Sequence, residues 1–330
     1  MDSLTAPRVV ADGNAAVTQA GTSESRTLLH LTVQLIESQA GKVIPVSLSW
    51  MNDAQVLARK FYYHLASLHV LVQPVEVVMP QGSASHIDHG SVLILARAAL
   101  ETYLTFAHVY GCSGPDLREF RHLTWHCAGL QDRQELQASA RKAENRQKLA
   151  DERVAIEALR VAMQTHGKWA KHHAKDRKAF LKGDWRAGRG WASIGVEAGF
   201  HPVHIRDLYS YLCGYSHASW LSILQVRDAR ELAQQAAMAA TSVSTACVLM
   251  SFFAHHYVAL FPEAEQVMAA QPAAAALVRK WHLSAERMAG QYDSGPKGGA
   301  GDRRANRYSS NSKEKGRWHF EFVTIRTTTC

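Results

Sequence analysis

The densest group of side chains able both to pack and to form hydrogen bonds lies in residues 209–220. These twelve residues include three tyrosines, a glycine, a histidine and a tryptophan. The imidazole of His217 titrates near neutral pH, so His217 is a candidate general acid or base. Tyr209, at the start of the stretch, adds a phenol that can both donate and accept a hydrogen bond.

Two charges in an otherwise apolar segment form a second candidate group. Arg97 and Glu101 are the only Asp, Glu, Lys or Arg residues between Ser91 and Pro115. They stand four residues apart and therefore share one face of a helix. The order Arg before Glu is the less favourable one for a surface pair, and a charge that faces a packed interior needs partners. We therefore predict a buried network that joins Arg97 and Glu101 to Tyr209 and His217. It serves either to fix the helix register or to form a small-ligand or catalytic pocket.

At these residues the chain resembles a widespread bacterial family, domain of unknown function 5677. The segment Leu95-Ala-Arg97-Ala-Ala-Leu-Glu101 is similar to the R-x-x-x-E helix of that family. Trp191-Ala-Ser-Ile followed by Ala198-Gly199 is similar to its Trp-containing turn, and residues 207–219 to its closing Y-x-x-L-x-x-x-x-H-x-S motif. The resemblance covers about residues 90–255. It departs at Cys213, where a small hydroxyl side chain is expected, and in the basic, histidine-rich insert at 168–182. It implies an all-α fold and carries no established activity.

A second resemblance concerns Arg121-His-Leu-Thr-Trp-His126. This spacing resembles the motif of the HEPN class of helical ribonucleases, in which an Arg and a His on a helix serve RNA cleavage without a metal, usually across a dimer. The resemblance implies that Arg121 and His126 are catalytic candidates and that a homodimer is one possible assembly. The alternative is a solvated or half-buried helix face.

Basic and aromatic residues alternate between residues 168 and 191. Lys and Arg side chains contact phosphates and aromatic side chains stack on bases, so this segment is a candidate for nucleic-acid contact. The candidate contact residues are Lys168, Trp169, Lys171, Lys175, Arg177 and Lys178. The alternative is a solvated loop whose tryptophans dock on the domain.

Metal and cofactor motifs are weak in this sequence. His122 and His126, and likewise His201 and His204, have the spacing of ligands on one helix face. Since no HExxH, CxxC or GK[ST] sequence accompanies them, we predict neither a metal nor a cofactor. Cys213 stands four residues before His217 and is either a nucleophile activated by that histidine or a small buried residue.

The composition fits an ordinary globular protein with a local basic excess. The 330 residues are 47% hydrophobic and 20% charged, and the net charge is +8. Residues 141–189 hold 14 Lys/Arg against 6 Asp/Glu, and residues 294–330 hold 8 against 3. The middle segment and the basic tail are therefore the parts that favour an acidic partner such as nucleic acid.

The five cysteines are widely spaced and residues 1–20 lack an apolar run, which predicts a cytoplasmic protein with reduced thiols and no signal peptide.

Helical periodicity dominates the chain. The predicted helices cover residues 25–38, 49–72, 88–110, 116–137, 141–166, 191–198, 202–214, 228–261 and 272–288. Proline and glycine at 74, 80 and 82 predict a loop, and residues 318–325 alternate weakly like a strand.

The uncharged run 236–261 has the length of a membrane span. It is rich in Ala, Ser and Thr and lacks flanking basic residues, so we predict a buried central helix and no membrane partner.

These patterns predict a single all-α, bundle-like domain over residues 25–290. A disordered lead, 1–24, precedes it and a disordered basic tail, 291–330, follows it. The predicted function is a helical interaction or ligand-binding module built around the buried Arg/Glu/Tyr/His network. The alternative is a HEPN-like, metal-independent ribonuclease, for example of a defence system, and the sequence does not decide whether the protein is an enzyme.

Overall fold

Helix α3 (His89–Val109) lies at the centre of the fold. The computed structural model describes residues 9–80 and 82–292, and within it 14 of the 21 residues of α3 are buried. The sequence explains this burial, since Arg97 and Glu101 are the only strongly charged residues that the helix contains. Asp88 is the N-cap of the helix, and its carboxylate accepts a hydrogen bond from the backbone N–H of Ser91 at 3.0 Å.

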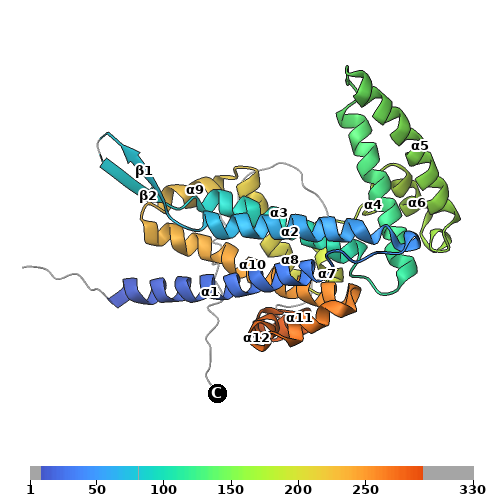
Figure 1. Ribbon diagram of the computed structural model, residues 1–330. Helices are drawn as coiled ribbons and strands as arrows, with labels where there is room; N and C mark the ends of the chain where they lie inside the picture. The colour runs from blue at the N-terminus through green and yellow to red at the C-terminus, as the bar shows by residue number, and fades with distance from the viewer. Residues whose placement is uncertain (1–8, 81, 293–330) are drawn as a thin grey trace, which may run out of the picture. The chain divides into compact units, whose positions relative to one another are not determined.

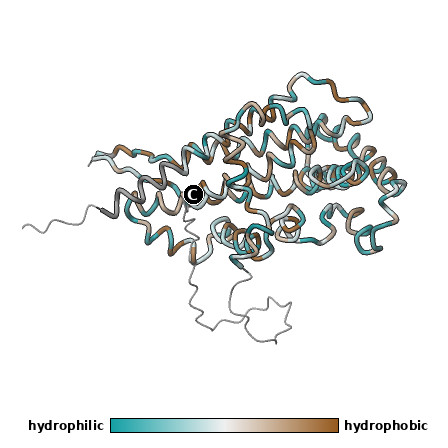
Figure 2. Tube along the Cα trace, turned by 90° about the horizontal axis from the view of Figure 1, so that it is seen from below, coloured by the Kyte–Doolittle hydropathy of each residue, from teal (hydrophilic) through white to brown (hydrophobic). Residues whose placement is uncertain are grey.

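Two long helices, α2 (Met51–Leu71) and α10 (Leu232–Leu260), pack against α3, and a third, α1 (Val9–Glu37), packs against α10 and α2 (Figure 1). Hydrophobic and hydrophilic residues alternate along these helices, as expected where one face is buried (Figure 2). Aromatic rings fill the space between them. Phe253 of α10 lies 4.9 Å from Phe61 of α2 and 5.0 Å from Phe106 of α3, measured between ring centroids. This aromatic contact forms the middle of the main hydrophobic core.

The remaining helices complete the part of the chain that the structure describes. They are η1 (Val46–Leu48), α4 (Pro115–Leu136), α5 (Ala143–Thr165), η2 (Trp169–Lys171), α6 (Ala174–Leu181), α7 (Trp191–Glu197), α8 (Pro202–Ser216), α9 (Trp220–Asp228), η3 (Pro262–Ala264), α11 (Glu265–Ala269), α12 (Pro272–Trp281) and α13 (Ala285–Tyr292). Helices α4, α5 and α6 enclose a second, smaller core of five buried residues: Phe120, Cys127, Ile156, Met163 and Phe180. The predicted all-α, bundle-like fold is confirmed.

A β-hairpin replaces the loop that the sequence predicts after α2. Strands β1 (Val75–Met79) and β2 (Gly82–His86) pair antiparallel, with Val77 opposite Ala84. Three valines in β1 favour an extended backbone, and Gly82 adopts a φ of +136°, which only glycine tolerates in such a turn. The proline and glycine residues therefore mark the ends and the turn of a hairpin, and the loop prediction was wrong here.

The boundaries at the two ends also differ from the prediction. Helix α1 begins at Val9, so the predicted disordered lead 1–24 is wrong for residues 9–24. Glu24 is held in place, because its carboxylate accepts hydrogen bonds from Lys280 at 2.6 Å and from the indole of Trp281 at 2.8 Å. All described residues belong to one compact unit, Met1–Asp293. From residue 293 onward the predicted basic tail, with its strand at 318–325, lies outside the described residues.

Two helices have the length and composition of membrane spans, α3 and α10. In the structure, 72% of the most apolar part of α3 and 67% of that of α10 are buried. A core helix of a soluble protein has the same properties, so this is a weak indication of a span. The predicted membrane-length run 236–261 lies in α10, which packs against α1 and α3.

Gly195 of α7 allows a close approach to α8. A Cβ atom at this position would lie 2.3 Å from Cγ1 of Ile205, a buried residue of α8. We expect Gly195→Ala to lower the free energy of unfolding by about 1–3 kcal/mol, because the added methyl group overpacks this contact. Urea denaturation measures the change.

Gly129 of α4 provides the matched control, since it is also helical but has nothing within 4 Å of an added Cβ. Gly129→Ala is expected to raise the free energy of unfolding by about 0.5–1 kcal/mol, because alanine loses less backbone entropy than glycine. Equal effects of the two substitutions would contradict the close approach of α7 to α8.

Candidate functional site

The structure brings together the four residues that the sequence predicts as one network. Arg97 Nε donates to Glu101 Oε1 at 2.9 Å, and Tyr209 OH donates to the same oxygen at 3.0 Å. Arg97 Nη1 lies 3.3 Å from His217 Nε2, and Arg97 Nη2 lies 3.4 Å from Tyr209 OH. We call these four residues the polar clasp, because they join the middle of α3 to the last turns of α8.

The polar clasp lies at the surface, which corrects the prediction of a buried network. The side chains of Arg97 and Glu101 are 19% and 28% exposed, and His217 is exposed. The reason is that α8 ends at Ser216 and His217 is its C-terminal cap, so its imidazole remains at the edge of the helix pair. Burial raises the pKa of Tyr209, and a hydrogen bond to Glu101 adds to this, which keeps the phenol protonated as a donor. Of the two main cavities among the described residues, neither is lined by a member of the clasp.

A cavity of about 380 Å³ lies between α3, α4, α6 and the segment before α7. Its lining combines aromatic, basic and small polar side chains. We call it the Arg121–Arg189 pocket, and its lining residues are His108, Phe120, Arg121, Thr124, His172, Asp176, Phe180, Trp185, Ala187 and Arg189. The sequence does not single out this group, because its members come from separate segments that are far apart along the chain.

A single carboxylate organises the polar side of this pocket. Glu197, the last residue of α7, accepts hydrogen bonds from the guanidinium groups of Arg121 and of Arg189, the latter at 2.9 Å. Its Oε2 also lies 3.1 Å from Nδ1 of His108. Arg121 Nη1 donates to the backbone carbonyl of His108 at 2.7 Å, and Arg189 Nη2 lies 3.1 Å from Nε2 of the same histidine. Two guanidinium groups and one imidazole therefore share one carboxylate.

The charge balance of this group is positive. Burial lowers the pKa of His108 to about 4, and the charges of Arg121 and Arg189 act in the same direction, so the imidazole is neutral at pH 7. Burial alone would raise the pKa of Glu197, but the hydrogen bond from His108 and the charge of Arg121 outweigh it and bring that pKa to about 2. Two permanent positive charges therefore share the carboxylate of Glu197 beside the cavity, and Asp176 adds a second carboxylate to its lining.

The segment before α7 holds Trp185 and Arg189 in a strained turn. The carboxylate of Asp184 accepts hydrogen bonds from the backbone N–H groups of Arg186 at 3.2 Å and of Gly188 at 2.6 Å. Between them Ala187 adopts a φ of +52°, in the left-handed region that costs an L-residue about 1–2 kcal/mol. Such strain is concentrated at functional sites, and here it falls on a residue that lines the cavity.

Arg121 and His126, the residues of the HEPN-like spacing, have different neighbours. Arg121 binds Glu197 and His108. His126 is exposed, and its ring centroid lies 5.6 Å from that of His122, which in turn lies 2.8 Å from a carboxylate oxygen of Asp53. The structure does not bring the two predicted catalytic residues together within the chain, because positions five apart point to different sides of α4.

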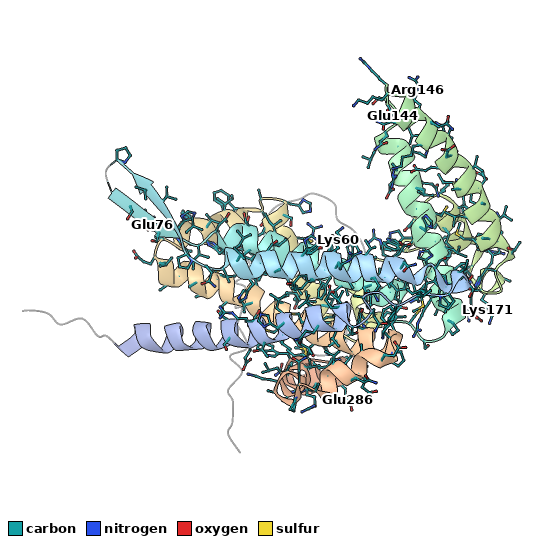
Figure 3. All side chains as sticks on the ribbon, viewed as in Figure 1. Lys60, Glu76, Glu144, Arg146, Lys171 and Glu286 are labelled. Atoms are coloured by element: carbon teal, nitrogen blue, oxygen red, sulfur yellow. The ribbon has the colours of Figure 1, made fainter. Side chains whose placement is uncertain are left out.

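The basic segment 168–191 uses its tryptophans for packing. Trp169 packs against the smaller core with the guanidinium of Arg177 above its ring at 6.0 Å, while Trp185 and Trp191 pack against the main core. The lysines at 171, 175 and 178 are exposed, as Figure 3 shows for the labelled Lys171, and Lys168 is half-buried. Contact of this segment with nucleic acid stays a prediction.

Within residues 9–80 and 82–292, no group of three His, Cys, Asp or Glu side chains could hold a metal ion. His201 and His204 instead contact Tyr292, the first by ring stacking at 4.6 Å between centroids and the second by a 3.3 Å contact to the phenol. Cys213 is a half-buried free thiol in the turn of α8 before His217. Neither histidine pair extends to a metal site.

Comparison of the chain with known protein families, with curated proteins and with solved structures finds no match. The resemblances to domain of unknown function 5677 and to the HEPN class therefore stay predictions. Any function of this chain has to be inferred from the geometry of the polar clasp and of the Arg121–Arg189 pocket.

The polar clasp is expected to stabilise the packing of α8 on α3. Glu101→Gln keeps the shape of the side chain but removes the charge that accepts from Arg97 and Tyr209. We expect it to lower the free energy of unfolding by about 1.5–2 kcal/mol, the lower part of the range for hydrogen bonds to a charged group, because both side chains are partly exposed. The control is Glu157→Gln, which breaks the exposed Arg160–Glu157 pair of α5 and should change stability by less than about 0.5 kcal/mol. Urea denaturation of both variants would contradict the clasp if they behaved alike.

His108 is expected to make the protein less stable in mild acid. Its folded pKa of about 4 lies below the ordinary 6.5, so the unfolded chain takes up the proton first. Its contribution is complete above pH 6.5 and is lost as the pH falls toward 4. Between pH 7 and pH 5 the wild type should lose about 2 kcal/mol more unfolding free energy than His108→Gln, which cannot titrate. The other histidines are present in both proteins, so parallel pH profiles from chemical denaturation would contradict the assignment.

Proposed function

We propose that this protein is a ligand-binding module whose Arg121–Arg189 pocket takes a small organic anion that carries a flat ring. The observation that carries the proposal is that the guanidinium groups of Arg121 and Arg189 share the carboxylate of Glu197 beside a cavity that Phe120, Phe180 and Trp185 help to line. The proposal keeps the ligand-binding function that the sequence favours but moves the site from the polar clasp to this pocket.

The size and walls of the pocket support a ligand of this class. A volume of about 380 Å³ falls at the lower end of the range for small-molecule sites. Phe120 and Phe180 line one part of it and Trp185 another. Aromatic side chains of this kind pack against flat rings by offset stacking or edge contacts.

The charged side of the pocket supports an anion. A guanidinium group presents a planar fork of N–H donors that matches a carboxylate or a phosphate. Arg121 and Arg189 at present share the single carboxylate of Glu197. An anion in the cavity would give the two guanidinium groups a second acceptor. Both ring nitrogens of His108 are already engaged, one by Glu197 and one by Arg189.

Binding is favoured over RNA cleavage by the contacts of α4. The HEPN-like interpretation needs Arg121 and His126 to act at one scissile bond. Arg121 is engaged with Glu197 and His108, whereas His126 lies beside His122. The described residues therefore support a pocket for an anion more directly than a nuclease centre.

Isothermal titration calorimetry with phenyl phosphate and with benzoate tests the proposal. We expect saturable binding of phenyl phosphate, weaker binding of inorganic phosphate, and at least a tenfold loss of affinity in Arg189→Met because one guanidinium fork is removed. Glu197→Gln should raise the affinity several-fold, since it removes the carboxylate that competes for both arginines.

The matched control is Arg206→Met, which removes an exposed arginine paired with Asp207 on α8, away from the cavity lining. This variant should bind both probes as the wild type does. Circular dichroism checks that each variant is folded. An absence of saturable binding to either probe, or an equal loss in the Arg206 and Arg189 variants, would refute the proposal.

A further inference from the structure

Helix α9 exposes large apolar side chains beside Arg227 and Asp228, while its one buried residue is the polar Ser222. Ser222 is 4% exposed, whereas Trp220 is 72%, Ile223 47% and Val226 50% exposed. A surface helix of a globular protein normally buries the apolar stripe and exposes the polar one. Large apolar side chains grouped in this way on a surface mark an interaction site.

Hydrogen bonds hold α9 in this orientation. The hydroxyl of Ser222 donates to the backbone carbonyl of Ser219 at 2.8 Å. Gln225 accepts from the phenol of Tyr215 of α8 at 2.8 Å. Turning α9 about its axis to bury Trp220 would break the second bond and leave the buried phenol of Tyr215 without its partner, which is costly. The fold itself therefore keeps the apolar face outward.

The apolar face continues onto the element that follows. Leu221 and, at the start of α10, Leu232 are also exposed. The side chain of Gln235 in α10 links the end of α9 to the segment before α3. It donates to the carbonyl of Ala229 at 3.1 Å and accepts from the backbone N–H of Ile87 at 2.8 Å. We call the exposed apolar residues of α9, together with Leu232, the α9 surface. No other part of the described chain covers it.

The charges around the α9 surface are balanced. Arg227 pairs with Asp228 at 2.8 Å, and the segment after the helix adds one exposed residue of each sign, Arg230 and Glu231. A helix that docks on an anionic membrane carries an excess of basic residues on its polar side. The basic excess of this chain lies instead in residues 141–189 and 294–330. The surroundings of α9 thus fit a protein partner better than a lipid surface.

We propose that the α9 surface is a dimerisation surface, at which two copies of this chain pack α9 against α9 around a twofold axis. A twofold interface requires a patch that is complementary to itself. A rim with paired charges of both signs meets this requirement, since each arginine can face an acidic residue of the other copy. An apolar centre with an exposed tryptophan and a polar rim is also the usual arrangement of a stable interface, which buries roughly 800 Å² on each partner.

Sedimentation velocity of the full chain, over a series of concentrations from low to high micromolar, tests the proposal. We expect a dimer in the wild type and a monomer in the double variant Trp220→Asp with Ile223→Asp, because carboxylates at the centre of the interface would be buried unpaired. The control is Val154→Asp, which changes an equally exposed valine of α5 and should leave the dimer intact.

A second measurement covers the case in which the double variant fails to fold. In a chain whose Cys112, Cys213 and Cys330 are replaced by serine, Ile223→Cys should be linked into a dimer by a short bismaleimide, while the same chain with Ile223 should not. A wild type that stays monomeric at every concentration, a control variant that dissociates as readily, or an Ile223→Cys protein that is not linked would each overturn the proposal. Co-sedimentation of a monomeric wild type with phosphatidylserine vesicles would overturn it as well and would assign the α9 surface to a membrane.

Discussion

The burial of α3 is the constraint on which the rest of the described structure depends. A helix with 14 buried residues out of 21 must be covered on several sides at once, and α2, α10, α7 and α8 all pack against it. The free-energy cost of burying its two charges is avoided, because the side chains of Arg97 and Glu101 lie at the edge of the contact with α8 and stay partly exposed. His108, in the last turn of α3, is buried, and its pKa falls as a result.

The two functional proposals concern regions with an unusual backbone conformation or an unusual exposure of apolar side chains. Ala187 adopts a left-handed backbone conformation beside the Arg121–Arg189 pocket, and α9 turns its apolar side chains to the outside. Natural sequences are otherwise consistent from local propensity to packing, so such departures are expected where function has required them. At each of the two places, hydrogen bonds from neighbouring residues hold the unfavourable arrangement: those of Asp184 in the first case and those of Gln225 in the second.

Much of the fold and one of the two polar groups could be predicted from local patterns. The uncharged run of α10, the periodicity of α2 and the cap at Asp88 each identify a helix, because helical periodicity depends only on residues a few positions apart. The polar clasp could be predicted because two charges on an apolar helix face require partners, and the stretch around Tyr209 is the richest source of them. Its exposure could not be predicted, since it depends on where α8 ends relative to α3. The β-hairpin was missed because proline and glycine mark both loops and tight turns.

The sequence by itself determined that this chain is helical, which helices are apolar enough to form its centre, and that Arg97 and Glu101 need partners. Only the tertiary structure decided that His108, Arg121, Arg189 and Glu197 form one group beside a cavity. His108 and Glu197 stand 89 positions apart, and nothing in the spacing of residues on separate helices reports on their distance in space. The same holds for α9, whose sequence would fit a core helix. Its large apolar side chains are exposed because the hydrogen bond from Tyr215 to Gln225 orients the helix, and that contact arises only when α8 and α9 pack together.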